Sequence, residues 1–406
     1  MTDSPSAPCL ALPRPPALPD FPWDSLKPYR ALAAAHPDGV VDLAIGTPVD
    51  DSPDAARAAL AAASNAPGYP AAIGTPAVRR AIIAWMERRR GVRGLTDDAV
   101  IPTIGSKESV ALLPLQLGAG PGDVIVHPRA AYPTYDVGAR LAGATPVPVD
   151  TDADPDTWGL PDGPDGAPAS PVIVWLNSPG NPDGHVLGVE QLTRIVAWAR
   201  HRGAVVIADE CYAELGWAEP WASEGVPSLL DARVTGRVNG TADTTGLLAL
   251  YSLSKQSNLA GYRAALLAGD PELVKAVTEV RKHSGLLVPA PVQAAIVAAL
   301  NDDAHVAVQR ETYRRRREAL LEATAAVGLT NDPASVAGLY LWLKGPDSMS
   351  TDLLGAFAEL GIVVAPGDFY GEAGAERIRM SLTGTDERVA AACERLRSAR
   401  ARELFT

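Results

Sequence analysis

A short segment rich in hydroxyl and basic side chains holds the residue types best suited to binding a phosphate group. The run SLSKQSNLAGYR, residues 252–263, begins at the end of an apolar stretch. Ser252, Ser254 and Arg263 supply hydroxyl donors and a guanidinium fork, which suit a phosphate dianion. Lys255 adds an amine that can act as a nucleophile or a base. A lysine after a strand is most often a solvated side chain, so its function depends on its neighbours.

A second element compatible with phosphate lies earlier in the chain. Gly105, Ser106 and Lys107 follow the apolar run AVIPTI and open a helical pattern. Backbone N–H groups and the positive end of a helix dipole favour an anion at such a place. Glycine at a strand-to-helix turn is often only a turn, but two such elements on one sheet support each other.

Three polar residues at or just after strand ends indicate a nitrogen heterocycle as the ligand. Asp209 ends the buried run AVVIAD, where an unpaired carboxylate is costly and calls for a cationic partner such as a pyridinium nitrogen. Tyr212 follows three residues later, and Asn181 lies in LNSPGNPDG after another apolar run. Both could hydrogen-bond a phenolic oxygen on the same ring. Asn181 could otherwise be a turn residue and Tyr212 a core aromatic.

The apolar pattern predicts the elements that position these residues. Short apolar runs alternate with amphipathic stretches from about residue 100, which is typical of strands and crossover helices in a mostly parallel sheet. The expected strands are AVIPTIG, DVIVHP, VIVWLN, AVVIAD, LLALYS and RAALLAG. We predict a large doubly wound α/β domain over residues 45–290 and a smaller α+β domain over residues 291–406. Residues 1–44 are expected to form an N-terminal arm and part of the small domain.

Composition narrows the possible partners and compartment. A chain of 406 residues exceeds the size of one hydrophobic core, and 47% hydrophobic with 21% charged residues is typical of a globular protein. The net charge of -12 argues against nucleic acid or an anionic membrane as a partner. The 3 cysteines form no CxxC pair, which suits a reduced, cytoplasmic location without a metal site. The proline-rich N-terminus is expected to be neither a signal peptide nor a spanning helix.

With these motifs in view, the chain resembles the fold-type I, class I/II aminotransferases, which depend on pyridoxal 5'-phosphate. In that family the S-x-S-K-x-x-x-x-x-G-x-R motif holds the lysine that binds the cofactor as a Schiff base, which falls here on Lys255. Ser252 and Arg263 then match phosphate ligands. In the D-E-x-Y motif, Asp209 matches the carboxylate at the ring nitrogen and Tyr212 the tyrosine at the phenolic oxygen.

Further positions acquire cofactor roles by the same resemblance. Gly105, Ser106 and Lys107 match the phosphate-binding turn, and Tyr132 matches the aromatic residue that stacks on the ring. Tyr69 matches the tyrosine that crosses a dimer interface to the phosphate of the other subunit, which implies a homodimer with shared sites.

The N-P-x-G motif and the C-terminal strand supply the residues that the resemblance assigns to the substrate. Asn181 matches the N-P-x-G asparagine, although the usual threonine is Asp183 here, a change we expect to be tolerated. Arg379 in RIRMSL matches the arginine that binds the substrate α-carboxylate, with Arg377 as the alternative register, and Gly46 lies on a segment that covers the site. The lysine amine must be uncharged to move a proton, so we expect burial and nearby cations to lower its pKa.

Longer strings suggest a substrate. PTIGSKE, AYPTYDVGARLAGA, RKHSGLLVPAPVQAA and VVAPGDFYG are similar to the succinyldiaminopimelate aminotransferases of actinobacteria. This resemblance implies N-succinyl-LL-diaminopimelate and 2-oxoglutarate as substrates, in lysine and diaminopimelate biosynthesis. Arg281, Lys282 and His283 precede a loop that enters the neighbouring site in that family and are candidates for the succinyl carboxylate. The alternative for these three residues is a solvated helix end.

Two other functions remain open at this point. One is an aminotransferase for another amine, such as acetylornithine or an aromatic amino acid. The other is a non-catalytic sensor that binds pyridoxal phosphate, as in transcription regulators that use this fold. Such a sensor is expected to carry an added DNA-binding domain, and residues 1–44 offer only a proline-rich arm.

Overall fold

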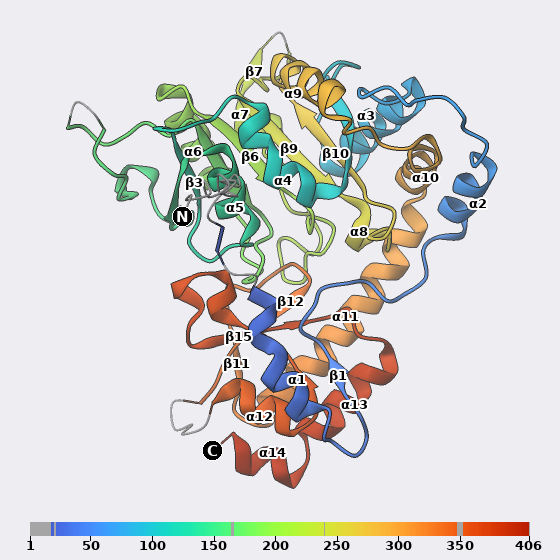
Figure 1. Cartoon of the computed structure of the whole chain (residues 1–406), viewed down its shortest axis with the longest axis vertical. Helices are drawn as coiled ribbons and strands as arrows, with labels where there is room; N and C mark the ends of the chain where they lie inside the picture. The colour runs from blue at the N-terminus through green and yellow to red at the C-terminus, as the bar shows by residue number, and fades with distance from the viewer. Residues whose placement is uncertain (1–17, 20–21, 164–165, 239, 347–351, 406) are drawn as a thin grey trace, which may run out of the picture.

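The computed structural model describes residues 18–19, 22–163, 166–238, 240–346 and 352–405, which form a large domain and a small domain (Figure 1). Cys9 and residues 1–17, 20 and 21 of the expected N-terminal segment lie outside the described residues. No helix in the described ranges is both long enough and apolar enough to cross a membrane.

A seven-stranded sheet in the order β2-β10-β9-β6-β5-β3-β4 forms the centre of the large domain. The strands are β2 (Val100–Ile104), β3 (Val124–Pro128), β4 (Thr145–Val149), β5 (Ile173–Asn177), β6 (Val205–Asp209), β9 (Leu247–Ser252) and β10 (Ala264–Gly269). β10 pairs antiparallel with β2 and β9, and the other neighbouring pairs are parallel. The doubly wound, mostly parallel sheet predicted from the sequence is therefore confirmed.

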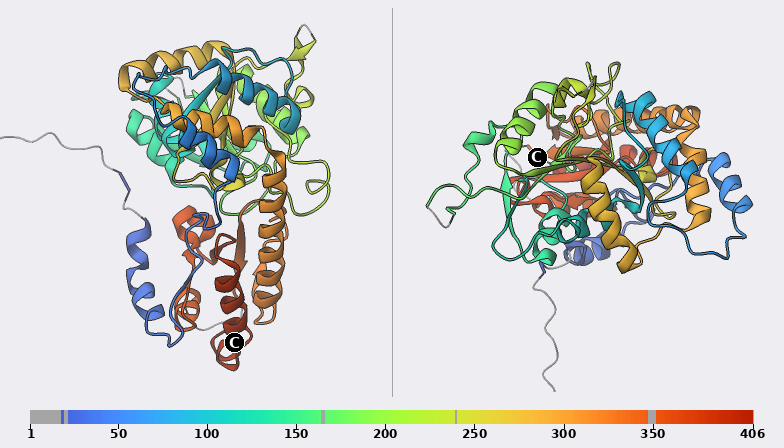
Figure 2. Two further views of the ribbon diagram at one scale, coloured as in Figure 1. Left: turned by 90° about the vertical axis from the view of Figure 1, so that its right-hand side faces the viewer. Right: turned by 90° about the horizontal axis from the view of Figure 1, so that it is seen from above.

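Two layers of helices cover this sheet, as the view from above shows (Figure 2). One layer is formed by α4 (Gly105–Gln116), α5 (Thr134–Ala142) and α9 (Pro271–Ser284), and the other by α3 (Pro76–Arg90), α6 (Val189–His201), α7 (Ala232–Thr235) and α10 (Ala290–Leu300). Because both faces are covered, six of the strands are near-continuous apolar runs. β4 was not predicted, since Pro146 and Pro148 argue against a strand, but it lies at the sheet edge, where proline is tolerated.

The small domain is built on an antiparallel sheet of four strands in the order β11-β12-β15-β14. Its strands are β11 (Thr330–Asn331), β12 (Tyr340–Lys344), β14 (Ala365–Pro366) and β15 (Arg377–Ser381), and β1 (Val41–Asp42) pairs in parallel with β13 (Ile362–Val363). The helices are η1 (Pro22–Leu26), α1 (Lys27–Ala33), α11 (Asp303–Ala325), α12 (Leu353–Glu359), η3 (Gly367–Tyr370), η4 (Glu372–Gly374), α13 (Asp386–Leu396) and α14 (Ala399–Leu404). The start of the chain thus packs on its C-terminal part.

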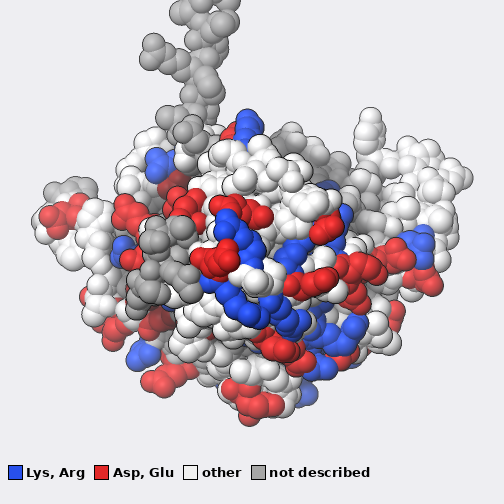
Figure 3. All heavy atoms as spheres, turned by 90° about the horizontal axis from the view of Figure 1, so that it is seen from below, with Lys and Arg blue, Asp and Glu red and all other residues white. Residues whose placement is uncertain are grey.

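Several short elements complete the described chain. They are α2 (Asp54–Ala62), η2 (Pro155–Thr157), the hairpin of β7 (Arg237–Val238) and β8 (Thr241–Ala242), and α8 (Leu253–Gln256). Seen from below, acidic and basic side chains interleave on the small-domain face (Figure 3). Ion pairs such as Arg400–Glu359 and Arg397–Glu322 account for part of this pattern. This face therefore carries no extended patch of one charge.

Helix α10 begins at the domain boundary predicted at residue 290. Helix α10 packs against α2 and α3 and buries Ala295, Ile296 and Ala299 in the large-domain core. Helix α11 then runs down into the small domain (Figure 2). The buried face of α10 is therefore part of the large-domain core, and the boundary at residue 290 stays a prediction.

A charged contact joins the domains at the loop that follows β5. His185 Nδ1 lies 2.9 Å from Asp152 Oδ2 and 3.8 Å from Asp183 Oδ2, and its Nε2 lies 3.6 Å from Asp332 Oδ1. Asp332 belongs to the small domain and also pairs with Arg377. Although burial opposes it, the hydrogen bond to Asp152 and the charges of Asp183 and Asp332 raise the pKa of His185 to about 9. A protonated His185 thus holds three carboxylates from both domains together.

Replacing His185 with Gln should destabilise the protein in a pH-dependent manner. Because folding raises the pKa of this imidazole from roughly 6.5 to about 9, its stabilisation is complete below pH ~6.5 and is lost as the pH rises through 9. We expect the variant to lose about 2 kcal/mol of unfolding free energy at pH ~6, since partial exposure reduces the full effect, and much less at pH ~10. Urea unfolding followed by circular dichroism measures both values.

Replacing the exposed His201 with Gln gives the matched control, and it should show no such pH dependence. A loss of equal size for His185→Gln at both pH values would show that the imidazolium does not hold this contact.

Candidate active site

The carboxyl ends of the parallel strands bring the predicted residues to one edge of the large sheet. Asp209 ends β6, Ser252 ends β9, and Gly105 begins α4 directly after β2. Arg263 precedes β10, and because β10 runs against its neighbours, its start lies at this same edge. The short helix α8, which carries Lys255, lies at the side of the large domain that faces the small domain (Figure 1).

Lys255 lies partly buried at the centre of this edge. Its Nζ donates a hydrogen bond to the carbonyl oxygen of Gly46, which places the LAIGTP segment over the lysine, as expected. Burial, assisted by the positive charges of Arg379 and Arg263, lowers the pKa of Lys255. The direction expected from the sequence is therefore confirmed, and the uncharged amine needed for proton transfer is favoured.

Gly105 and Arg263 meet in a corner suited to an anion. Gly105 has a φ of +71°, and a Cβ added there would lie 2.2 Å from a guanidinium nitrogen of Arg263. Arg263 itself has a φ of 55°, an uncommon conformation for a residue with a side chain and one that often marks a functional constraint. Ser252 Oγ bonds Ser254 Oγ at 2.9 Å, and Lys107 Nζ lies 5.9 Å from the centre of the Tyr132 ring.

Asp209 is a buried carboxylate without an ion pair among the described residues. It accepts hydrogen bonds from the Tyr135 hydroxyl and from the backbone N–H of Cys211, each at 3.1 Å. Burial raises the pKa of Asp209 in spite of these bonds. The side chain of Asn177 bonds the Asp209 carbonyl oxygen and the Asn181 N–H, so the two loops are held together. A cationic ring nitrogen would supply the charge that Asp209 lacks.

Arg379 is the second buried charge of the site, and its hydrogen-bond partners are neutral. From β15 it donates to Asn181 Oδ1 at 2.8 Å and to the Ala44 carbonyl oxygen at 2.7 Å. Its Nε is buried and has no hydrogen-bond partner among the described residues. The guanidinium carbon lies among three aromatic rings, at 3.8 Å from the centre of Tyr340, 4.8 Å from Tyr370 and 6.0 Å from Trp23. A carboxylate would give this guanidinium a counter-charge.

The alternative register for the carboxylate-binding arginine is not favoured. Arg377 donates to the Trp342 carbonyl oxygen and pairs with Asp332 at 3.4 Å, at the domain contact around His185. Two residues along the same strand, Arg379 reaches Asn181 instead. The structure thus favours Arg379.

Comparison with known proteins agrees with this arrangement. The family model described as aminotransferase class I and II matches residues 38–396. The chain belongs to this family. Its members use pyridoxal 5'-phosphate as cofactor.

Individual relatives differ in the substrates for which they are named. A 4-dedimethylamino-4-oxo-anhydrotetracycline transaminase of Streptomyces rimosus is 53% identical over 93% of this chain and 99% of its own length. A probable aminotransferase of Mycobacterium tuberculosis is 52% identical over 94% of this chain and 85% of its own length. The solved structure of a probable N-succinyldiaminopimelate aminotransferase from Thermus thermophilus has a TM-score of 0.78 at 28% identity, covering 93% of this chain and 99% of that one.

The site of this aminotransferase fits pyridoxal phosphate at three points. Asp209 is a buried carboxylate that lacks a counter-charge, as a protonated ring nitrogen requires. Gly105 and Arg263 form a corner for the phosphate in which a Cβ would clash. Lys255, with its lowered pKa, lies near the same edge and can hold the aldehyde carbon.

The site also contains residues that the sequence did not identify. They are Trp23, Tyr135, Cys211, Tyr340 and Tyr370. Tyr212 reaches the site as predicted, and its hydroxyl lies 3.3 Å from that of Tyr340. In sequence these additional residues are indistinguishable from core aromatics and core cysteines, so only Tyr212, within its motif, could be found.

Outside the cluster described above lie two predicted features: the run of Arg281, Lys282 and His283, and the single residue Tyr69. Arg281 is fully buried and pairs with Glu108 of α4 at 2.9 Å, because it lies on the face of α9 that packs on α4. Its Nε and one terminal nitrogen are buried without a hydrogen-bond partner among the described residues, and its binding of a succinyl carboxylate stays a prediction. Lys282 pairs with Glu279, and His283 is exposed. Both residues fit the alternative of a solvated helix end. Tyr69 is 99% exposed on the loop before α3.

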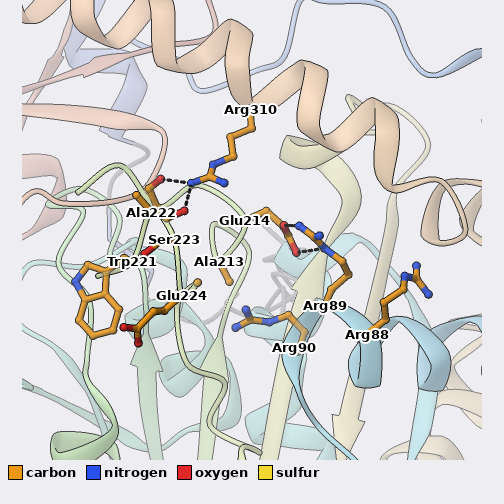
Figure 4. A pocket seen from close by; sticks show the side chains of 12 residues that line it. Arg88, Arg89, Arg90, Ala213, Glu214, Trp221, Ala222, Ser223, Glu224 and Arg310 are labelled. Atoms are coloured by element: carbon orange, nitrogen blue, oxygen red, sulfur yellow. Dashed lines mark hydrogen bonds and ion pairs between the residues drawn. The ribbon is translucent and has the colours of Figure 1, made fainter. Parts of the chain in front are cut away.

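A pocket of about 250 Å³ between the end of α3, the loop after β6 and α11 lies outside the site (Figure 4). Four arginines line it, but three form ion pairs, which are Arg88–Asp303, Arg89–Glu214 and Arg90–Glu210. The fourth, Arg310, donates to the carbonyl oxygens of Gly216 and Ala222. The charges of these arginines are therefore largely satisfied within the protein.

Gly105→Ala should weaken cofactor binding. An added Cβ would displace the Arg263 guanidinium and strain a backbone held at positive φ, so we expect the dissociation constant for pyridoxal phosphate to rise at least about tenfold. Titration of the apoenzyme with the cofactor, followed by absorbance, measures it. Gly118→Ala is the matched control, because Gly118 also has a positive φ but a Cβ there would contact nothing within 4 Å. Equal affinities for the two variants would contradict the assigned phosphate corner.

Proposed function

We propose that this aminotransferase moves an amino group between N-succinyl-LL-diaminopimelate and 2-oxoglutarate, giving succinylamino-oxopimelate and glutamate. The observation that carries an amino-acid substrate is Arg379, a buried guanidinium whose hydrogen-bond partners are neutral. The succinyl compound itself is supported by the strings similar to actinobacterial succinyldiaminopimelate aminotransferases and by the Thermus thermophilus neighbour. This reaction would serve lysine and diaminopimelate biosynthesis.

We assign the cofactor contacts as follows. When bound, pyridoxal phosphate supplies an aldehyde that condenses with an amine and a ring that accepts electrons from the α-carbon. Lys255 holds the aldehyde end, Asp209 keeps the ring nitrogen protonated, and Tyr212 and Asn181 hydrogen-bond the phenolic oxygen. The phosphate is held by Gly105, Ser106, Lys107, Ser252 and Arg263, and Tyr132 stacks on the ring.

The remaining steps belong to the side chains around the substrate. Arg379 binds the α-carboxylate, and Asn181, bonded to the same guanidinium, fixes its direction. With its amine free, Lys255 would take the proton from the substrate α-carbon as a general base and would deliver a proton to that carbon, as a general acid, in the reverse direction. Its lowered pKa keeps the amine available for this task. Gly46 and its segment close over the lysine and limit access of water.

A second candidate substrate is a polycyclic ketone of the kind named for the Streptomyces rimosus relative. It is favoured by the 53% identity and by the aromatic residues around Arg379, which offer stacking surfaces for fused rings. The first candidate is preferred because its own α-carboxylate can pair with Arg379, so that both half-reactions use this guanidinium, whereas a ketone of this kind would leave that pairing to the amino donor alone.

A substrate panel with the holoenzyme separates these candidates. Glutamate formation from 2-oxoglutarate should be fastest, by kcat/KM, with N-succinyl-LL-diaminopimelate, and slower with acetylornithine, aromatic amino acids or aminated tetracyclines. Arg379→Lys should lower kcat/KM for the preferred amino acid by about 100-fold, because a lysine cannot form the bidentate pair. Arg377→Lys is the control and should change it little. Turnover of acetylornithine or an aromatic amino acid without turnover of the succinyl compound would rule out the proposed substrate.

We further propose a cytoplasmic homodimer with shared active sites. Cys211 and Cys393 are buried and unbonded, which suits a reducing compartment. Tyr69 is almost fully exposed in the single chain, as a residue that reaches into a partner subunit would be. In that arrangement its hydroxyl binds the phosphate of the neighbouring site.

Hybrid dimers test this sharing of residues. A mixture of Lys255→Ala and Tyr69→Phe chains should form hybrids in which one site keeps both native residues, so that site should bind the cofactor with wild-type affinity. Cofactor titration of the purified hybrid measures this. If Tyr69 serves its own chain, each site of the hybrid carries a defect, and no site of wild-type affinity will be found.

A further inference from the structure

Tyr340 joins three parts of the site that belong to different segments of the chain. It lies in β12 of the small domain and is buried. Its hydroxyl lies 3.3 Å from the Tyr212 hydroxyl in the large domain. A Cβ added to Gly46 would lie 2.2 Å from the same hydroxyl oxygen, so the segment over Lys255 rests directly on Tyr340.

The ring of Tyr340 makes the closest aromatic contact to the substrate-binding arginine. The guanidinium carbon of Arg379 lies 3.8 Å from the ring centre, nearer than it lies to Tyr370 or Trp23. A guanidinium above an aromatic ring gains cation–π attraction and is held flat against the ring. The ring therefore fixes the plane in which Arg379 can receive a carboxylate.

The two hydroxyl groups differ in how they hold their protons. Although burial opposes it, the positive charge of Arg379 lowers the pKa of Tyr340. Burial, together with the neighbouring Tyr340, raises the pKa of Tyr212 well above its ordinary value. Tyr340 is thus the more acidic partner and the better donor, and a hydrogen bond from Tyr340 to Tyr212 leaves the Tyr212 proton free to point toward the cofactor.

We propose that Tyr340 is a positioning residue of the aminotransferase, which orients Tyr212 through its hydroxyl and Arg379 through its ring. This inference rests on the proposed contacts of Tyr212 and Arg379, and it deepens them by linking the cofactor side of the site to the carboxylate side. The hydroxyl and the ring have separate effects, which two substitutions can distinguish.

Tyr340→Phe removes the hydroxyl and keeps the ring. Tyr212 then loses its hydrogen-bond donor and would stabilise a negative charge on the cofactor's phenolic oxygen less well. The proton between that oxygen and the nitrogen of Lys255 would then be held more tightly. Loss of this proton changes the absorption of the bound cofactor. The pH at the midpoint of that change should rise by about 0.5–1 unit. kcat should fall, and KM for glutamate should change little.

Tyr340→Leu removes the ring as well. The guanidinium of Arg379 should then lose its contact with the aromatic ring. The dissociation constant of glutarate, a dicarboxylate without an amine, should rise about five- to tenfold relative to Tyr340→Phe. The absorption change of the holoenzyme on glutarate binding measures this constant. Thermal unfolding of both holoenzyme variants shows whether they are folded at the assay temperature.

Tyr370→Phe is the matched control for the hydroxyl. Tyr370 belongs to the same aromatic group around Arg379, but its hydroxyl has no hydrogen-bond partner among the described residues, so this variant should keep the wild-type pH midpoint. A midpoint for Tyr340→Phe equal to that of the wild type would overturn the role of the hydroxyl. Equal glutarate binding by Tyr340→Phe and Tyr340→Leu would overturn the role of the ring.

Neither measurement uses the proposed amino donor. Rejection of N-succinyl-LL-diaminopimelate in the substrate panel would therefore leave these tests intact. Failure of the proposed cofactor attachment would show itself differently, because the wild-type holoenzyme would then lack a titrating absorption band.

Discussion

Two buried charges of opposite sign, Asp209 and Arg379, set the requirements for the rest of the active site. Asp209 forms no ion pair in the described part of the chain, and Arg379 bonds only neutral groups. Leaving a charge in a protein interior without a partner costs several kcal/mol, roughly, unless a ligand brings the opposite charge. The two charges therefore favour a ligand with a cationic ring nitrogen near Asp209 and a carboxylate near Arg379.

The fold supplies the places where such charges can be held. Parallel strands end together, so Asp209 and Ser252 share one edge, and the reversed strand β10 adds Arg263 there by its start instead of its end. Arg379 and Tyr340 come from adjacent strands of the small domain, where Arg379 pairs with Trp342, two residues along β12 from Tyr340. Chemistry and substrate recognition thus derive from different domains, which meet at the Asn181 loop.

The sequence predicted the part of the site that motifs specify. Lys255, Asp209 and Arg263 could be found because each follows or precedes an apolar run with a recognisable spacing. Tyr340 could not, because a tyrosine in an apolar strand has no local feature that separates a site residue from a core residue. The surroundings of Arg281 could not be predicted for a related reason: the sequence shows its charge, but its partner Glu108 is distant in sequence and becomes a neighbour only when α9 packs on α4. β4 was missed because its edge position, which makes its prolines acceptable, is a property of the whole sheet.

The same distinction explains why the reaction class is better specified than the substrate. The proposed cofactor contacts lie at fixed strand ends in the large domain, whereas the surroundings of Arg379 combine strands, a 3₁₀ helix and the N-terminal segment. The Asn181 loop is bound on one side by Arg379 and on the other by His185, whose carboxylate partners come from both domains. A change in the small domain can therefore alter which carboxylate or ring system is accepted without disturbing Lys255 or Asp209. Proteins similar to this chain carry names for such different compounds as a tetracycline ketone and a diaminopimelate derivative.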